Sequence, residues 1–266
     1  MTFKFYYINL KNSTDRKKNM ELFFKNLSKI SNINYERIEA FDGRVENIDN
    51  YLINCEFNKL YSSLTNERSQ PKNVSLTKGE FGCLYSHIKA LNEFVKTDDP
   101  YCFICEDDLD PNILGFMSKK KFKMEFNKII SKINKYGIIS LSCVGDYNLI
   151  KKIVTEIIPK DENKFVSFKK YLFYGTACYM INKEIANKII NSYVSIKNNT
   201  LCLQFNGLNT SLVADNFIYM HSNTKFYLPS LFYTKEYNST IKDNINKMVK
   251  VQNIMKSNYS NIITEI

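Results

Sequence analysis

The sequence predicts an α/β fold in which a mostly parallel central sheet is flanked by helices and extended by antiparallel strands. Two observations support this fold class. Through the first half of the chain, short apolar runs alternate with segments that repeat apolar residues at helical spacing. In the second half, several short apolar runs follow one another closely, as antiparallel strands do. With 266 residues and 31.2 kDa, the chain is long enough to bury a substantial core.

The first half of the chain opens with a strand, a helix and a second strand. Phe3 to Leu10 has the character of a buried strand, and Ser13 or Thr14 is placed to cap the helix that follows. The next strand covers about Asn34 to Ile38, and Asp42-Gly43 marks a turn after it. The apolar residues of the helix recur every three or four positions: Met20, Phe23, Phe24, Leu27 and Ile30.

A second helix is predicted from a capping box. In Thr77-Lys78-Gly79-Glu80, the threonine can accept from the backbone N–H of Glu80 while Glu80 reaches back to Thr77. The helix should end before Asp98-Asp99-Pro100, since a proline disfavours helical backbone at the residue before it. A strand over Tyr101 to Cys105 follows, and Glu106-Asp107-Asp108 stands at its carboxyl end. In open α/β sheets ligands bind beyond these ends, so the acids are expected at a site.

The second half is expected to contain two basic helices and several strands. Lys119 to Lys135 is amphipathic, with Phe and Ile on one side and Lys on the other. It is either an ordinary solvated helix or a face that meets an anionic membrane or acceptor. The remaining expected elements are strands at Ile138 to Cys143, Phe165 to Phe168 and Tyr171 to Ile181, a helix from Asn182 to about Tyr193, and a basic helix over Lys242 to Lys256.

Composition and charge exclude several classes of protein. The contents of 44% hydrophobic and 24% charged residues, with 8 Gly and 5 Pro, exclude collagen-like and disordered sequence. The 37 Lys and Arg exceed the 27 Asp and Glu by ten, which favours acidic partners unless it reflects compositional bias. No apolar stretch of about 18 residues and no signal peptide are seen. We therefore expect a cytoplasmic protein, with peripheral contact to an anionic membrane left open.

The cysteine and histidine contents limit the chemistry of the chain. Seven cysteines without paired spacing argue against a disulfide framework. Cys102 and Cys105 form a C-x-x-C, but in a strand a separation of three places them on opposite faces, so we expect core packing. Only two histidines occur, which excludes a zinc site built on several imidazoles.

The three adjacent acids are the best candidate for chemistry. Their charges repel one another where the surroundings become less polar, so something positive is expected beside them. Carboxylate oxygens suit Mg²⁺ or Mn²⁺, ions that commonly bridge one or two carboxylates and a substrate's phosphates. The alternative is a solvated turn whose repulsion nearby Lys residues relieve. Asp110, which precedes Pro111, is more typical of a turn than of a ligand.

Several short motifs in order resemble one family. They are Tyr7-Ile8-Asn9-Leu10, Asp15-Arg16, Arg37-Ile38-Glu39-Ala40-Phe41-Asp42-Gly43, Gly79-Glu80, Ser86-His87, Glu106-Asp107-Asp108, Gly175-Thr176-Ala177-Cys178-Tyr179-Met180-Ile181 and Asp215-Asn216-Phe217. Together they resemble family 25 glycosyltransferases, over about residues 3 to 230. The resemblance implies a single GT-A-type nucleotide-sugar-binding domain over 1–266, with a nucleotide-binding half at about 1–115 and an acceptor half at about 116–266. It also implies a UDP-sugar donor, Mn²⁺ or Mg²⁺, and transfer with inversion.

The resemblance also implies roles for individual residues near the donor. Glu106-Asp107-Asp108 takes the place of the family's D-x-D element, with Asp108 as the direct metal contact and Glu106 on the metal, ribose or bound water. Asn9 and Arg16 lie where a strand meets its helix and could meet the nucleotide. Glu80 and His87 are seven apart and share a helical face, which points either to the donor pocket or into a buried pair.

Inverting transfer needs a base that takes the proton of the acceptor hydroxyl. Asp215 is the candidate for this role, with a helix N-cap as the alternative. Gly175 and Thr176, the small residues before it in the chain, are counted with the donor-binding residues. His221 is a weaker candidate for a late metal ligand.

The predicted function is therefore a metal-dependent inverting glycosyltransferase that moves galactose or glucose from UDP to a hydroxyl on a glycan or a hydroxylysine-type acceptor. A basic nucleic-acid-binding protein is one alternative, weakened by the lack of a concentrated basic run or a known RNA-binding motif. A phosphate hydrolase or nucleotidyltransferase that uses the same acids is another, and a binding domain without activity is the last. The oligomeric state is not readable from the sequence.

Overall fold

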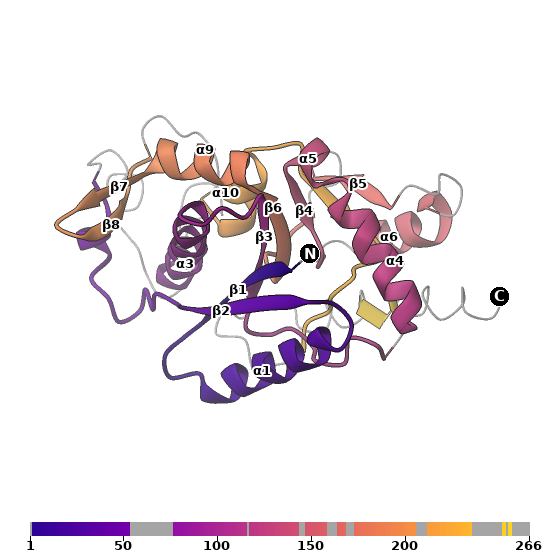
Figure 1. Cartoon of the computed structure of the whole chain (residues 1–266). Helices are drawn as coiled ribbons and strands as arrows, with labels where there is room; N and C mark the ends of the chain where they lie inside the picture. The colour runs from indigo at the N-terminus through magenta and orange to yellow at the C-terminus, as the bar shows by residue number, and fades with distance from the viewer. Residues whose placement is uncertain are drawn as a thin grey trace.

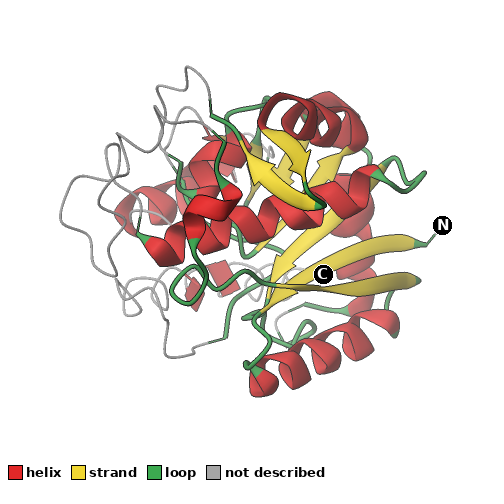
Figure 2. Cartoon of the chain, turned by 90° about the vertical axis from the view of Figure 1, so that its left-hand side faces the viewer, coloured by secondary structure: helices red, strands yellow, loops and turns green. Residues whose placement is uncertain are grey.

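The fold is described from a computed structural model. The structure describes residues 2–53, 77–115, 117–143, 147–158, 164–168, 173–205, 212–235, 252–253 and 255–256. Its main body is a sheet with helices on both faces (Figures 1 and 2).

The central sheet has seven described strands in the order β2-β1-β3-β6-β4-β9-β5. Five of them share one direction, whereas β6 and β5 run opposite to their neighbours. The predicted largely parallel sheet with antiparallel additions is thus confirmed. The strands are β1 Phe3–Asn9, β2 Ile33–Glu39, β3 Tyr101–Glu106, β4 Ile138–Ser140, β5 Phe165–Ser167, β6 Cys178–Asn182 and β9 Lys225–Tyr227.

The remaining described elements are helices and one hairpin. The hairpin pairs β7 Val194–Lys197 with β8 Thr200–Leu203. The helices are α1 Thr14–Ser28, α3 Lys78–Val95, α4 Lys119–Ile130, α5 Ile133–Tyr136, α6 Tyr147–Lys152, α9 Lys183–Tyr193 and α10 Ala214–Tyr219, with a 3-10 turn at Ile48–Tyr51 and a π turn at Ile153–Ile157.

The strands divide their side chains between two hydrophobic cores. In β1, Phe5 and Tyr7 pack with α1 and α4, whereas Tyr6 and Ile8 pack on the other face with α3, α9 and α10. Cys102 and Cys105 follow the same alternation and fall into different cores, as their spacing predicts. The six described cysteines form no disulfide.

Two of the predicted helix starts have the expected caps. The Thr77 hydroxyl accepts from Glu80 N at 3.2 Å and Thr77 N donates to Glu80 Oε2 at 2.9 Å, which completes the capping box of α3. Asn182 caps α9 through Ile185 N at 3.0 Å. Ser13 precedes α1, but its side chain makes no capping bond.

Other predicted boundaries differ from the structure. The basic helix expected over Lys119 to Lys135 is divided at Ser131 into α4 and α5. Of the strand expected over Tyr171 to Ile181, residues 171–172 lie outside the described part of the chain, and within 173–182 the central-sheet strand is β6, because Gly175 adopts a φ of +103°, which breaks an extended chain. The strand from Ile138 ends at Ser140, whose hydroxyl donates to the Ser142 carbonyl at 2.6 Å. Most of Lys242 to Lys256 lies outside the described residues.

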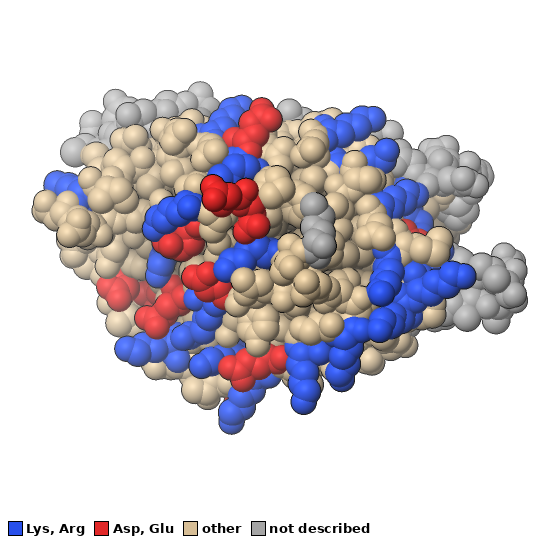
Figure 3. All heavy atoms as spheres, viewed as in Figure 1, with Lys and Arg blue, Asp and Glu red and all other residues tan. Residues whose placement is uncertain are grey.

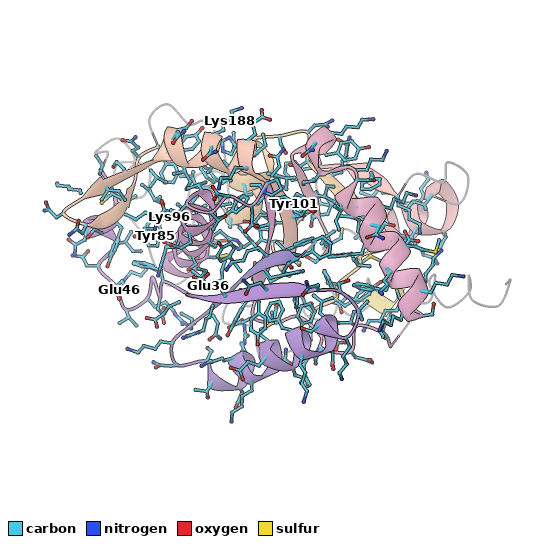
Figure 4. All side chains as sticks on the ribbon, viewed as in Figure 1. Glu36, Glu46, Tyr85, Lys96, Tyr101 and Lys188 are labelled. Atoms are coloured by element: carbon cyan, nitrogen blue, oxygen red, sulfur yellow. The ribbon has the colours of Figure 1, made fainter. Side chains whose placement is uncertain are left out.

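The hairpin β7–β8 and strand β9 are elements that the sequence did not predict. The hairpin turns at Asn198 and Asn199, whose φ angles of +50° and +61° are those of a type I′ turn. Tyr85 of α3, labelled in Figure 4, donates to the carbonyl of Leu201 at 2.7 Å. This bond ties the hairpin to the helix that carries His87.

The basic surface lies mainly over α4. Figure 3 shows Lys and Arg gathered over this helix, and Lys119, Lys120, Lys123 and Lys128 are exposed. The acid of α4, Glu125, is instead buried and accepts from Lys164 at 2.6 Å. In the described part of the chain, no helix has the length and hydropathy needed to cross a membrane.

A close backbone contact holds the loop after β2 against α3. A Cβ on Gly82 would lie 2.7 Å from the Phe41 carbonyl oxygen, and one on Gly43 would overlap the carbonyl oxygen of Lys78. Both neighbours are backbone atoms, which cannot move aside as a flexible side chain can. The two glycines therefore allow the loop and the helix to meet.

Gly43→Ala should destabilise the protein by about 1–3 kcal/mol through overpacking, which for a domain of this size lowers the Tm by roughly 2–4 °C per kcal/mol. Thermal unfolding measures the change. Gly115→Ala is the matched control, because its Cβ would meet only the side chain of the exposed Asn112. Equal Tm values for the two variants would contradict the close contact.

Candidate functional site

The candidate site forms where several chain segments reach one edge of the sheet. Strands β1 and β3 are parallel, so Asn9 and Glu106 end side by side, with Ile8 in register with Glu106. Strand β6 is antiparallel to β3 and begins opposite its end, with Cys178 in register with Cys105. Thr176, just before β6, therefore reaches the same edge as the acids.

Asp107 is neutralised by groups from the first strand and helix. Arg16 of α1 donates to Asp107 Oδ1 at 2.8 Å, and Asn9 Nδ2 donates to Oδ2 at 2.7 Å. The other end of the Asn9 amide accepts from Arg37 Nε at 3.0 Å. Asn9 is 1% exposed, so it acts as a buried bridge between two charged groups. The sequence predicted a positive group beside the acid cluster, and in the structure that group is Arg16.

Glu106 has partners from the opposite side of the site. Its Oε1 accepts from the Thr176 hydroxyl at 2.5 Å and lies 3.4 Å from His87 Nε2. His87 is fully buried, and its Nδ1 lies 3.2 Å from the Tyr179 hydroxyl. Burial alone raises the pKa of Glu106, but the hydrogen bonds and charge of His87 and the bond from Thr176 outweigh it and lower the pKa overall.

Asp108 is left without such compensation. Its Oδ1 is buried and has no hydrogen-bond partner among the described residues. Burial, followed by the charges of Glu106 and Asp107, raises the pKa of Asp108 to about 8. A buried carboxylate oxygen with no donor is costly, so this atom is available to a cation.

An open cleft of about 140 Å³ adjoins the acids. It is bounded by the end of β1, residues 40–44 after β2, Arg16 of α1, the first half of α3, and Glu106 and Asp107. His87 and Cys83 of α3 line it, and Glu80 is not among its lining residues. The sequence allowed Glu80 to face either the donor pocket or a buried partner. In the structure its carboxylate accepts from Thr77 N in the capping box.

Asp215 lies in the first turn of α10 and meets the glycine loop before β6. Its Oδ2 accepts from Gly175 N at 3.1 Å and its Oδ1 from Asn216 N at 2.8 Å. The Gly175 carbonyl in turn accepts from Tyr219 at 2.7 Å. Burial, then the charges of Glu106 and Asp215, raise the pKa of the Cys83 thiol. Asp215 is linked to the acids through this loop, because Gly175 donates to Asp215 and the next residue, Thr176, donates to Glu106.

His221 does not join the acid cluster. Its ring packs against Tyr193 and Phe217, with centroids 5.2 and 5.1 Å away. Burial, with a smaller effect of Lys188, lowers the pKa of His221 to about 4. Within the described chain, His221 belongs to no group of side chains that could hold a metal ion. The structure therefore places this weaker candidate in aromatic packing.

Three site residues were not singled out individually from the sequence. Arg37 and Tyr179 support Asn9 and His87, but both are ordinary strand residues whose partners lie far away in the chain. Cys83 stands four positions before His87 in the sequence. This spacing places both side chains on one face of the helix and was the signal that could have identified Cys83 as a site residue.

Comparison with known proteins identifies one family. The sequence model of glycosyltransferase family 25, described as an LPS biosynthesis protein, matches residues 2–203. The matched range contains Asn9, Arg16, His87, the three acids and Thr176, but it ends before Asp215. A comparison with curated proteins gives no match.

Asp108→Asn should stabilise the protein increasingly as the pH rises from about 4 to 8. The folded state holds the proton of Asp108 up to about pH 8, whereas the unfolded chain loses it near pH 4, so the wild type loses stability across this window. In metal-free buffer at pH 8 we expect a gain of roughly 2–4 °C in Tm, equivalent to about 1 kcal/mol.

The matched control for this pH series is Asp98→Asn, which removes an exposed carboxyl. Its Tm should follow that of the wild type at every pH. A difference between Asp108→Asn and the wild type that does not grow with pH would contradict the uncompensated charge of Asp108.

Proposed function

Because the chain belongs to glycosyltransferase family 25 and is a glycosyltransferase by that membership, we propose that it moves galactose or glucose from a UDP-sugar to a hydroxyl on a glycan or hydroxylysine-type acceptor, with inversion and with Mn²⁺ or Mg²⁺. One observation carries the proposal. Of three adjacent acids, Glu106 and Asp107 line an open cleft and are paired by the protein, whereas the next residue, Asp108, has a buried oxygen without a donor among the described residues.

A hard divalent cation fits this arrangement. Asp108 would hold it, with Glu106 adjoining through the oxygen that His87 and Thr176 do not engage. Carboxylate oxygens prefer Mg²⁺ or Mn²⁺, and the cation would relieve the charge that raises the pKa of Asp108. When bound, the ion supplies positive charge for the diphosphate leaving group.

The cleft supports binding of the nucleotide beside the cation. Arg16 donates to Asp107 through one guanidinium nitrogen and lines the cleft, where its positive charge would attract phosphate oxygens. The first turn of α1 lies at the same edge, where backbone N–H groups favour anions. The contact of Gly43 with α3 shapes the opposite wall. Together these groups fit an anionic ligand such as UDP.

Asp215 remains the proposed base for the acceptor hydroxyl. Gly175 and Asn216 hold its carboxylate in place through backbone N–H groups. The same glycine loop leads into Thr176, which holds Glu106, so the loop would set the distance between base and donor. A carboxylate fixed in this way can accept the proton as the anomeric carbon is attacked.

The family membership favours transfer over the alternative functions. A nucleic-acid-binding protein would rest on the basic surface of α4, none of whose residues lines the cleft beside the acids. A phosphate hydrolase could use the same acids, and its attacking water could use the same base, so the acceptor distinguishes the two functions. Release of UDP that depends on an acceptor hydroxyl would separate transfer from hydrolysis.

UDP should stabilise the wild type only in the presence of Mn²⁺ or Mg²⁺. At a ligand concentration of about 100 Kd the gain is about 2.7 kcal/mol, and Asp108→Asn should lose most of it. Thermal shift measures both, and Asp98→Asn should retain the full effect. Metal-independent stabilisation by UDP, or an unchanged response in Asp108→Asn, would oppose the cation assignment.

Asp215→Asn should lower kcat by about 10²–10⁴ while leaving the UDP and Mn²⁺ thermal shift unchanged. The assay uses UDP-glucose and UDP-galactose with a panel of hydroxyl acceptors. Asparagine can keep only one of the two backbone hydrogen bonds through its single side-chain oxygen, so the unchanged thermal shift also checks that the fold and the donor site are preserved. Wild-type kcat in this variant would remove Asp215 from the base role.

A further inference from the structure

A thiol, an imidazole and a carboxylate converge on one side of the cleft, apart from Asp108. Cys83 Sγ, a ring nitrogen of His87 and a carboxylate oxygen of Glu106 all lie within 4.8 Å of one another. All three residues line the cleft. We infer that Cys83, His87 and Glu106 form a binding site for a soft or borderline divalent cation, with Zn²⁺ as the best fit.

The distances match tetrahedral zinc. With Zn–N of about 2.0–2.1 Å and Zn–O of about 2.0–2.2 Å, tetrahedral geometry places the two ligand atoms roughly 3.4 Å apart. His87 Nε2 and Glu106 Oε1 are 3.4 Å apart. With Zn–S of about 2.3 Å, the sulfur of a tetrahedral site lies roughly 3.5 Å from each of the other two ligand atoms. Cys83 Sγ lies within 4.8 Å of both, so a shift on the order of 1–1.5 Å by rotation about its single torsion would complete the site.

The helix and the surrounding side chains prepare these ligands. Cys83 and His87 are four residues apart on α3 and therefore share one face. The Tyr179 hydroxyl holds His87 Nδ1 at 3.2 Å and Thr176 holds Glu106 at 2.5 Å. Such supporting bonds orient metal ligands in known sites. Three protein ligands beside an open cleft leave a fourth position for water or an incoming ligand.

The ligand chemistry separates this site from the one at Asp108. A thiolate and an imidazole select zinc-like ions, whereas Mg²⁺ and Mn²⁺ prefer an all-oxygen set. A thiolate and a carboxylate together balance the charge of Zn²⁺. The zinc would lie in the cleft that is proposed above to take UDP, so the ion would alter nucleotide binding. This last consequence alone rests on the proposed function.

The test titrates ZnCl₂ into the full chain by calorimetry and uses Co²⁺ as a spectroscopic probe. Wild type should bind one Zn²⁺, and Co²⁺ should show a sulfur-to-metal charge-transfer band. Cys83→Ser should lose the band and bind Zn²⁺ about 10–100-fold more weakly or worse, which is the loss seen when only supporting residues of a metal site are changed.

Two variants serve as controls. Cys202→Ser removes a thiol that lies in β8 beside the Asn50 carbonyl, and it should bind Zn²⁺ like the wild type. Asp108→Asn should also keep Zn²⁺ binding and the cobalt band. Absence of zinc binding in the wild type, equal binding by Cys83→Ser, or loss of binding in Asp108→Asn would each overturn the site. UDP binding without zinc tests the proposed function separately.

Discussion

The three adjacent carboxylates at the end of β3 can share one edge of the sheet only because each has a different electrostatic environment. Asp107 is paired with Arg16 and Asn9, and Glu106 with Thr176 and His87, while the Oδ1 of Asp108 has no partner in the described chain. The repulsion is therefore not spread evenly but concentrated on one side chain. Asp108 is therefore the carboxylate whose charge the described protein leaves uncompensated.

The topology of the sheet enforces this division. The parallel neighbours β1 and β3 bring Asn9 and the acids to one edge, so the donors to Asp107 come from β1 and α1. The antiparallel β6 begins at that edge and supplies Thr176 from the other side. Helix α3 packs on one face of the sheet and places His87 Nε2 3.4 Å from Glu106 Oε1. A fully parallel sheet would have carried the start of β6 to the far edge.

The sequence predicted the local features well and the non-local ones poorly. The capping box of α3 and the position of the acids after β3 depend on nearby residues, and both are present as expected. The partners of the acids depend on contacts 98 residues apart for Asn9 and Asp107 and 70 apart for Thr176 and Glu106, which no periodicity encodes. The hairpin β7–β8 was missed because its Asn-Asn turn lacks glycine.

Glu106 is shared by the two proposed cation sites, whose other ligands prefer different ions. On one side Asp108 offers only oxygen, and on the other Cys83 and His87 offer sulfur and nitrogen. Proteins select among divalent ions by ligand type and geometry more than by raw affinity, so one carboxylate can serve a hard ion and a soft ion in turn. Two cations drawn to one carboxylate also repel each other. Occupancy of the thiol side would therefore act on the oxygen side through Glu106 itself, without any change in fold.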